Sequence, residues 1–165
     1  DSLTGLVNRR AIYKFARGEL ERARRVFEPL SVIFLDLDNL KKINDEYGHL
    51  LGDEALKLVA QTIKERCRTY DGIGRWAGDE FLIVLPGISP EDAVSATKRI
   101  LKGIHGTPLA LPDGGTCTLS ASAGVTTLTR TSHAKTLLDD MIQKADEALY
   151  RAKANGGNAV EVAWF

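Results

Sequence analysis

The sequence has few of the features that mark specialised classes of protein. Its 165 residues include only two cysteines, Cys67 and Cys117, which lie far apart and outside any metal-ligand spacing. This usage indicates two reduced thiols rather than a disulfide framework or a cysteine metal site. The three histidines show no H-x-x-x-H spacing, and no apolar stretch is long enough to span a membrane.

The charges are balanced, which limits the partners that the chain can attract. Lys and Arg together number 22, as do Asp and Glu, so the net charge is zero. A chain without a global basic field is not drawn to a nucleic-acid polymer or to an anionic membrane. Any site for an anion must therefore be local.

Composition and length indicate one globular domain. The chain is 44% hydrophobic and 27% charged, and its 165 residues suit one domain with a substantial core. It begins without a methionine. We therefore expect residues 1–165 to form a single domain of a longer regulated protein: a cytoplasmic domain whose parent carries a sensor or membrane-anchoring segment.

Hydrophobic periodicity predicts helices and strands that mostly alternate. Helices are expected at residues 11–26, 39–47, 51–63 and 90–104, and along a segment that includes 137–149. Strands are expected at residues 30–37, 73–76, 81–85, 116–126 and 159–162. The second and third strands form a hairpin that breaks the alternation. This favours an α+β fold with one mixed, mostly antiparallel sheet of about five strands flanked by helices.

The most informative segment is RWAGDEFLIVL at residues 75–85. Gly78 precedes two adjacent acids, Asp79 and Glu80, and a run of apolar residues follows them. This order predicts a tight turn at the start of a buried strand. Carboxylates near a core cost free energy unless a metal or another cation compensates them.

A second acidic pair lies at the end of the apolar strand expected at 30–37. Asp36 is within the strand, and Asp38 directly follows it. If that strand neighbours the hairpin, Asp36 and Asp79 converge at one end of the sheet. Carboxylates on rigid strand ends suit Mg²⁺, which keeps part of its shell for water and substrate phosphate. Two such ions can clamp the oxygens of a phosphoryl transfer. The following helix start and Lys41 would face the phosphates.

A structural interpretation of these acids stays open at this point. All of them fit caps and turn residues on a solvated edge, and Asp38 in particular is a plausible helix cap. Asp36 has a less natural structural role, because it follows a run of apolar residues.

Five segments, in order along the chain, resemble the GGDEF domain of diguanylate cyclases. They are DSLTGLVNRR at 1–10, FLDLDNLKKIND at 34–45, GHLLGD at 48–53, AGDEF at 77–81 and DEALYRAK at 146–153. The resemblance implies a palm-like nucleotide cyclase fold with a ferredoxin-like core. It also implies a reaction in which a homodimer joins two GTP molecules into cyclic di-GMP and releases two pyrophosphates, with feedback inhibition by the product.

The resemblance implies roles for individual residues. Asp36, Asp79 and the Leu37 carbonyl would bind Mg²⁺ or Mn²⁺. Glu80 would be the essential second acid, which holds a second metal or helps to deprotonate the attacking ribose 3′-hydroxyl. The implied substrate contacts are Asn44 and Asp53 for guanine, and Gly78, Lys153 and the backbone at Asn39, Leu40 and Lys41 for the phosphates. Asp53 favours GTP, because cyclases of the family that take ATP change this residue.

A second ligand site is implied by Arg68 and Asp71, which form an R-x-x-D motif before the family's signature segment, AGDEF at 77–81. In the family this motif marks the site of product inhibition. Arg68 would hold phosphate or stack on guanine, and Asp71 would accept a hydrogen bond from the base. The alternative is a surface ion pair beyond a helix end.

Leu40 stands where the family usually has Phe, and two further departures bear on activity. Ala77 replaces the first signature glycine, and Gly157 stands where an arginine usually reaches a phosphate. The missing arginine is expected to weaken GTP binding by about 1–3 kcal/mol. These changes favour the alternative of a degenerate domain that binds GTP or cyclic di-GMP and signals by contact. The retained Asp36, Asp79 and Glu80 favour the enzyme, and Asp53 disfavours an adenine-containing product.

Overall fold

The computed structural model describes residues 1–129 and 137–165, so His133 lies outside the described residues. Five helices and seven strands are present in these ranges. The helices are α1 (Arg9–Val26), α2 (Leu40–Tyr47), α3 (His49–Arg66), α4 (Pro90–His105) and α5 (Leu138–Ala154). The strands are β1 (Leu30–Leu37), β2 (Gly72–Ala77), β3 (Glu80–Pro86), β4 (Leu109–Ala110), β5 (Thr116–Cys117), β6 (Ala121–Leu128) and β7 (Val160–Ala163).

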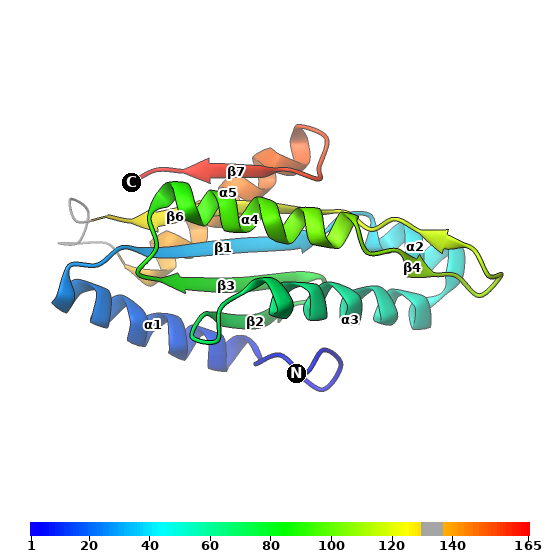
Figure 1. Cartoon of the computed structure of the whole chain (residues 1–165), viewed down its shortest axis with the longest axis horizontal. Helices are drawn as coiled ribbons and strands as arrows, with labels where there is room; N and C mark the ends of the chain where they lie inside the picture. The colour runs from blue at the N-terminus through cyan, green and yellow to red at the C-terminus, as the bar shows by residue number, and fades with distance from the viewer. Residues whose placement is uncertain (130–136) are drawn as a thin grey trace.

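The main sheet has five strands in the order β2-β3-β1-β6-β7, and helices cover both of its faces (Figure 1). β1 is antiparallel to both β3 and β6, whereas β6 and β7 are parallel. The predicted α+β fold, its mostly antiparallel sheet and its hairpin are therefore confirmed. Strands β4 and β5 form a separate two-stranded sheet.

The core consists of two layers because side chains alternate across the central strand. Ile33, Leu35 and Leu37 of β1 pack with α3 and α4 on one face. Val32 and Phe34 pack with α1 and α5 on the other. β1 is thus buried along its whole length. A strand end in this position holds its carboxylate against a rigid core.

The structure differs from the expected elements in four places. Strand β4 is not among the expected strands. The strand expected at 116–126 is divided, because β5 pairs with β4 whereas β6 joins the main sheet. Asn39 precedes α2 instead of starting it, since its φ of +59° is left-handed. Leu137 is the N-cap of α5 and is 61% exposed, so it is not part of the apolar face of that helix.

Candidate active site at the ends of the central strands

The predicted signature turn lies where the β2–β3 hairpin reverses direction. Ala77 pairs with Glu80 across the hairpin, and Gly78 has a φ of +42°. Ala77 is exposed and is not among the described residues with positive φ. Its methyl group therefore meets no left-handed strain, and alanine at the first signature position is compatible with this turn.

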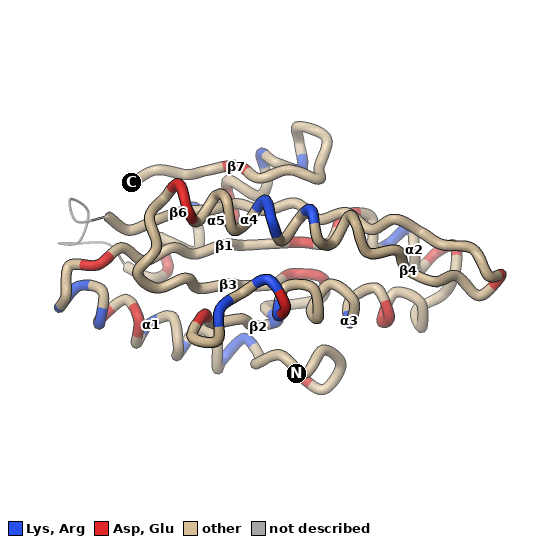
Figure 2. The backbone as a smooth tube through the Cα atoms, in the orientation of Figure 1, with Lys and Arg blue, Asp and Glu red and all other residues tan. Residues whose placement is uncertain are grey.

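Asp36 of β1 lies beside this turn, as the order of strands predicts. β1 and β3 are antiparallel neighbours in which Asp36 pairs in register with Glu80. The Leu37 amide also donates to the Asp79 carbonyl at 3.2 Å. Acidic residues accordingly meet at the adjoining ends of these two strands (Figure 2). The predicted convergence of the two acidic segments is confirmed.

The Asp36 carboxylate is buried, and within the described residues only one of its oxygens has a partner. Lys153 of α5 donates to Oδ2, whereas the buried Oδ1 has no hydrogen-bond partner in residues 1–129 and 137–165. Burial raises the pKa of Asp36 to about 7, with a further contribution from Asp79, although Lys153 opposes the shift. A buried acceptor without a partner costs free energy, and a cation beside it would offset that cost.

Glu80 lies in the same acidic environment. Burial raises its pKa, and the charges of Asp146 and Asp79 raise it further. Lys153 and Arg9 oppose this shift. Acids thus outnumber cations around the turn, and this excess favours a bound positive charge.

The residues present fit a divalent metal, but they do not form a complete cage. Within residues 1–129 and 137–165, no three His, Cys, Asp or Glu side chains form a ready-made metal cluster. The carboxylates of Asp36 and Asp79, the first with its unpartnered Oδ1, and the Leu37 carbonyl suit an ion that keeps water and substrate oxygens in its shell. Mg²⁺ and Mn²⁺ share this preference for oxygen ligands.

Asp38 has a structural role that differs from the helix cap considered for it. Its carboxylate accepts from Ser120 Oγ at 2.9 Å, from Ser122 Oγ at 2.8 Å and from the Asn158 amide at 2.9 Å. It therefore ties β1 to β6 and to the turn that follows α5. The N-cap of α2 is Asn39, which makes no side-chain capping bond. The first amides of α2, at Leu40 and Lys41, remain available for an anion.

The predicted guanine-reading residues lie at the junction of α2 and α3. The Asn44 Oδ1 atom is buried and has no hydrogen-bond partner in the part of the chain that the structure describes. A Cβ on Gly52 would lie 1.8 Å from that atom, so glycine is required for the observed position of Asn44. Asp53 is the next residue of α3 and is half-buried. The junction thus presents an unsatisfied amide next to a carboxylate.

Comparisons with known proteins agree with this geometry. The family model described as "Diguanylate cyclase, GGDEF domain" matches residues 1–159. This chain belongs to the GGDEF domain family. The diguanylate cyclase DosC of Escherichia coli is 39% identical over 162 residues, which are 98% of this chain and 34% of DosC. The GGDEF domain described here thus spans about a third of that relative.

Solved structures give the same result for the fold. The diguanylate cyclase SiaD of Pseudomonas aeruginosa, in complex with its activator SiaC, has a TM-score of 0.92 and 32% identity, over 99% of this chain and 61% of SiaD. A microbial GGDEF domain, solved in a study of its interaction with cyclic di-GMP, has a TM-score of 0.83 and 32% identity. The match covers 99% of this chain and 95% of that domain. In the described parts of this GGDEF domain, no helix is long and apolar enough to cross a membrane.

The R-x-x-D motif of this GGDEF domain forms a closed pair. Arg68 Nη2 donates to Asp71 Oδ1 at 2.8 Å, and the Arg68 amide donates to Asp71 Oδ2 at 2.7 Å. The Asp71 side chain is only 2% exposed, whereas that of Arg68 is 36% exposed. Arg68 also lies over the ring of Tyr70 and donates to the Pro86 carbonyl at 3.1 Å. The pair is therefore better ordered than a simple surface ion pair.

Two further arginines near these sites were not singled out from the sequence. Arg99 of α4 lines a cavity of about 250 Å³ together with Arg68 and Asp71. Arg75 of β2 donates from Nε to the Gly78 carbonyl at 2.9 Å and pairs with Asp1 at 3.3 Å. Arg75 stands two residues before the signature, but nothing in its spacing identifies Asp1 as its partner.

Proposed function

We propose that this GGDEF domain is a diguanylate cyclase, which condenses two GTP molecules into cyclic di-GMP and releases two pyrophosphates. The observation that carries the proposal is the buried, unpartnered Oδ1 of Asp36 beside Asp79 and Glu80. A domain that only binds nucleotide has no need of all three acids, Asp36, Asp79 and Glu80. The family and the curated diguanylate cyclase relative support the same reaction.

In the proposed site, Asp36, Asp79 and the Leu37 carbonyl hold Mg²⁺ or Mn²⁺. The bound metal would neutralise phosphate charge and polarise the α-phosphate. Glu80, whose pKa is raised by burial, is suited to accept the proton of the attacking 3′-hydroxyl. Lys153, which holds Asp36 in the structure, would move toward the phosphates when a cation takes over that carboxylate.

We assign substrate selection to the residues at the junction of α2 and α3. The N-terminal amides of α2 and the turn at Gly78 would position the triphosphate, and Asn44 and Asp53 would bind the guanine edge. The carboxylate can accept from guanine N1–H and the amino group, whereas adenine offers no such pair of donors. We therefore propose GTP as the substrate.

Each domain would hold one GTP, so turnover requires two domains that face each other. We propose a homodimer in which each 3′-oxygen attacks the α-phosphorus of the opposite nucleotide. An upstream sensor or regulatory domain in the parent protein would control this pairing. Product inhibition is assigned to Arg68 and Asp71, with Arg99 as an additional cation beside them.

The test is direct. The domain is incubated with GTP and Mg²⁺ over a wide range of protein concentrations, and cyclic di-GMP and pyrophosphate are measured. We expect both products, a rate per domain that rises with protein concentration, and no cyclic product from ATP. Parallel reactions with Mn²⁺ or with EDTA test the metal. Absence of product with an enforced dimer would refute the enzyme and leave the binding module as the function.

A further inference from the structure

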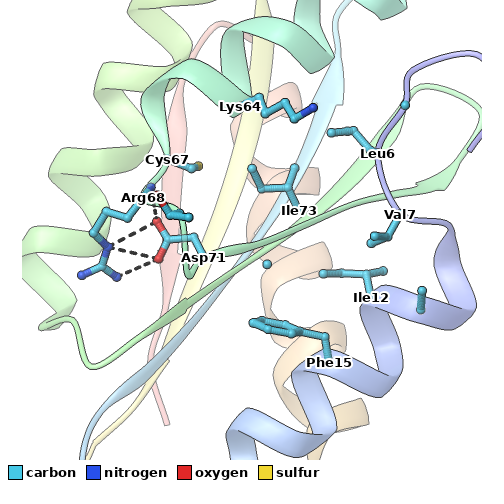
Figure 3. A pocket seen from close by; sticks show the side chains of 13 residues that line it. Leu6, Val7, Ile12, Phe15, Lys64, Cys67, Arg68, Asp71 and Ile73 are labelled. Carbon is cyan, nitrogen blue, oxygen red and sulfur yellow. Dashed lines mark hydrogen bonds and ion pairs between the residues drawn. The ribbon is translucent and has the colours of Figure 1, made fainter.

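A cavity of about 620 Å³ lies between the opening segment, the start of α1, the end of α3 and the edge strand β2 (Figure 3). Its walls are mainly apolar and include Leu6, Val7, Ile12, Phe15 and Ile73. This volume lies within the range of about 300–1,000 Å³ that small-molecule sites occupy. The cavity is separate from the acids of the signature turn, none of which line it.

The charges on the walls leave one cation without a counterpart. Arg68 and Asp71 neutralise each other, and the Arg68 guanidinium extends away from the cavity (Figure 3). The Cys67 thiol is neutral at physiological pH, because burial raises its pKa to about 12. Among the lining residues, all of which are described, Lys64 is thus the charged group without an acidic partner. It complements one negative charge on a ligand.

We propose that this cavity binds a compact apolar molecule with a single anionic group, such as an aromatic carboxylate or sulfonate. Its apolar body would contact Leu6, Ile12 and Phe15, and its anionic group would face Lys64. Guanine nucleotides fit the apolar part of these walls poorly, because their polar edges would be buried there without hydrogen-bond partners. The Arg68 guanidinium, which is proposed above to bind the product, extends away from this part of the cavity (Figure 3). The ligand therefore differs in class from both GTP and cyclic di-GMP.

The cavity is connected to the signature turn through its own wall. The Val7 carbonyl accepts from the Arg75 amide at 3.0 Å, and Arg75 in turn donates to the Gly78 carbonyl at 2.9 Å. Val7 and Gly74 also form a parallel bridge between the opening segment and β2. A ligand bound between the opening segment and β2 would alter the hydrogen bonds that position Arg75.

The probe for this proposal is 1-anilinonaphthalene-8-sulfonate, an apolar aromatic molecule with one sulfonate. Fluorescence titration of the intact domain is expected to give one saturable site. Ala11→Trp, at an exposed residue of the cavity wall, is expected to abolish that binding, whereas Lys14→Trp outside the wall is not.

Lys64→Gln is expected to weaken binding roughly two- to fivefold, as for an exposed charge pair. Lys57→Gln on the same helix is the matched control.

Two measurements on the unmodified domain keep the test independent of the folding of the variants. The probe is expected to raise the melting temperature, because it binds the folded state. Amide resonances of Gly72, Ile73 and Arg75 are expected to shift during the titration. Three results would each overturn the proposal. They are probe binding that persists in a folded Ala11→Trp variant, a melting temperature lowered by the probe, and Gly72 and Ile73 amide resonances that do not shift. All readouts are binding measurements, so they do not depend on cyclase activity.

Discussion

Asp36 and Asp71 both have buried carboxylates beside the central sheet, but the hydrogen bonding of their oxygens differs. Among the described residues, no group donates to Asp36 Oδ1, and burial raises the pKa of Asp36 to about 7. Both oxygens of Asp71 accept hydrogen bonds from the backbone or side chain of Arg68. The proposed catalytic region is therefore electrostatically incomplete without a ligand, whereas the proposed product region is complete.

This difference indicates two modes of ligand binding. At the signature turn, a cation supplies a charge that the fold lacks, so binding relieves an existing cost. At the R-x-x-D motif, a ligand competes with an existing ion pair and must use the exposed part of Arg68 and the nearby Arg99. Product binding is then expected to depend on groups around the pair as much as on the pair itself.

Glu80→Gln is expected to give the largest effect, a loss of turnover of roughly 10²–10⁴-fold. The amide keeps the shape of the side chain but cannot accept the hydroxyl proton or neutralise a metal. Cyclic di-GMP formation is measured by chromatography, and circular dichroism checks the fold. Glu54→Gln, at a surface residue paired with Lys57, is the control. Turnover near that of the parent would remove Glu80 from the mechanism.

Arg68→Ala is expected to relieve product inhibition and also to lower the free energy of unfolding by about 1–3 kcal/mol, because Asp71 stays buried with fewer donors. Inhibition is measured with added cyclic di-GMP, and stability by urea unfolding. The double variant Arg68→Ala/Asp71→Ala removes the buried acid and is expected to regain part of the stability. Unchanged inhibition would place the inhibiting product elsewhere, for example in the active site.

The contrast between the two regions was only partly visible in the sequence. The convergence of Asp36 and Asp79 followed from strand ends, because each acid adjoins an apolar run. Periodicity also gave the helices and the hairpin. The role of Asp38 did not follow, since its partners Ser120 and Asn158 lie 82 and 120 residues away. Neither burial nor hydrogen bonding across such separations is encoded in local spacing.

Asp36→Asn is expected to stabilise the metal-free domain on the order of 1–2 kcal/mol at pH 8, because it removes a buried charge. The pKa of Asp36 is about 7 in the folded state and near 4 when unfolded. Between these values the folded state binds more protons, so stability falls as pH rises. Urea midpoints in EDTA at pH 4 and pH 8 measure this slope, which the variant is expected to lose. Equal slopes would show that Asp36 does not titrate in this range.

Gly157→Arg tests the second departure from the family pattern and is expected to have the smallest effect. Gly157 has a φ of +74°, and a Cβ there would lie 3.2 Å from Asp38 Oδ2. We expect a loss of stability of about 1 kcal/mol from the left-handed conformation. Because the side chain would start beside the Asp38 carboxylate, we expect it to recover only the lower end of the roughly 1–3 kcal/mol of a phosphate contact, so that the KM for GTP falls by no more than about fivefold. Gly157→Ala carries the same backbone strain without the guanidinium, so the difference between the two variants isolates the charge. A much lower KM for the arginine variant alone would mean that the turn next to Asp38 can rearrange, and that the catalytic region lacks a phosphate contact as well as a cation.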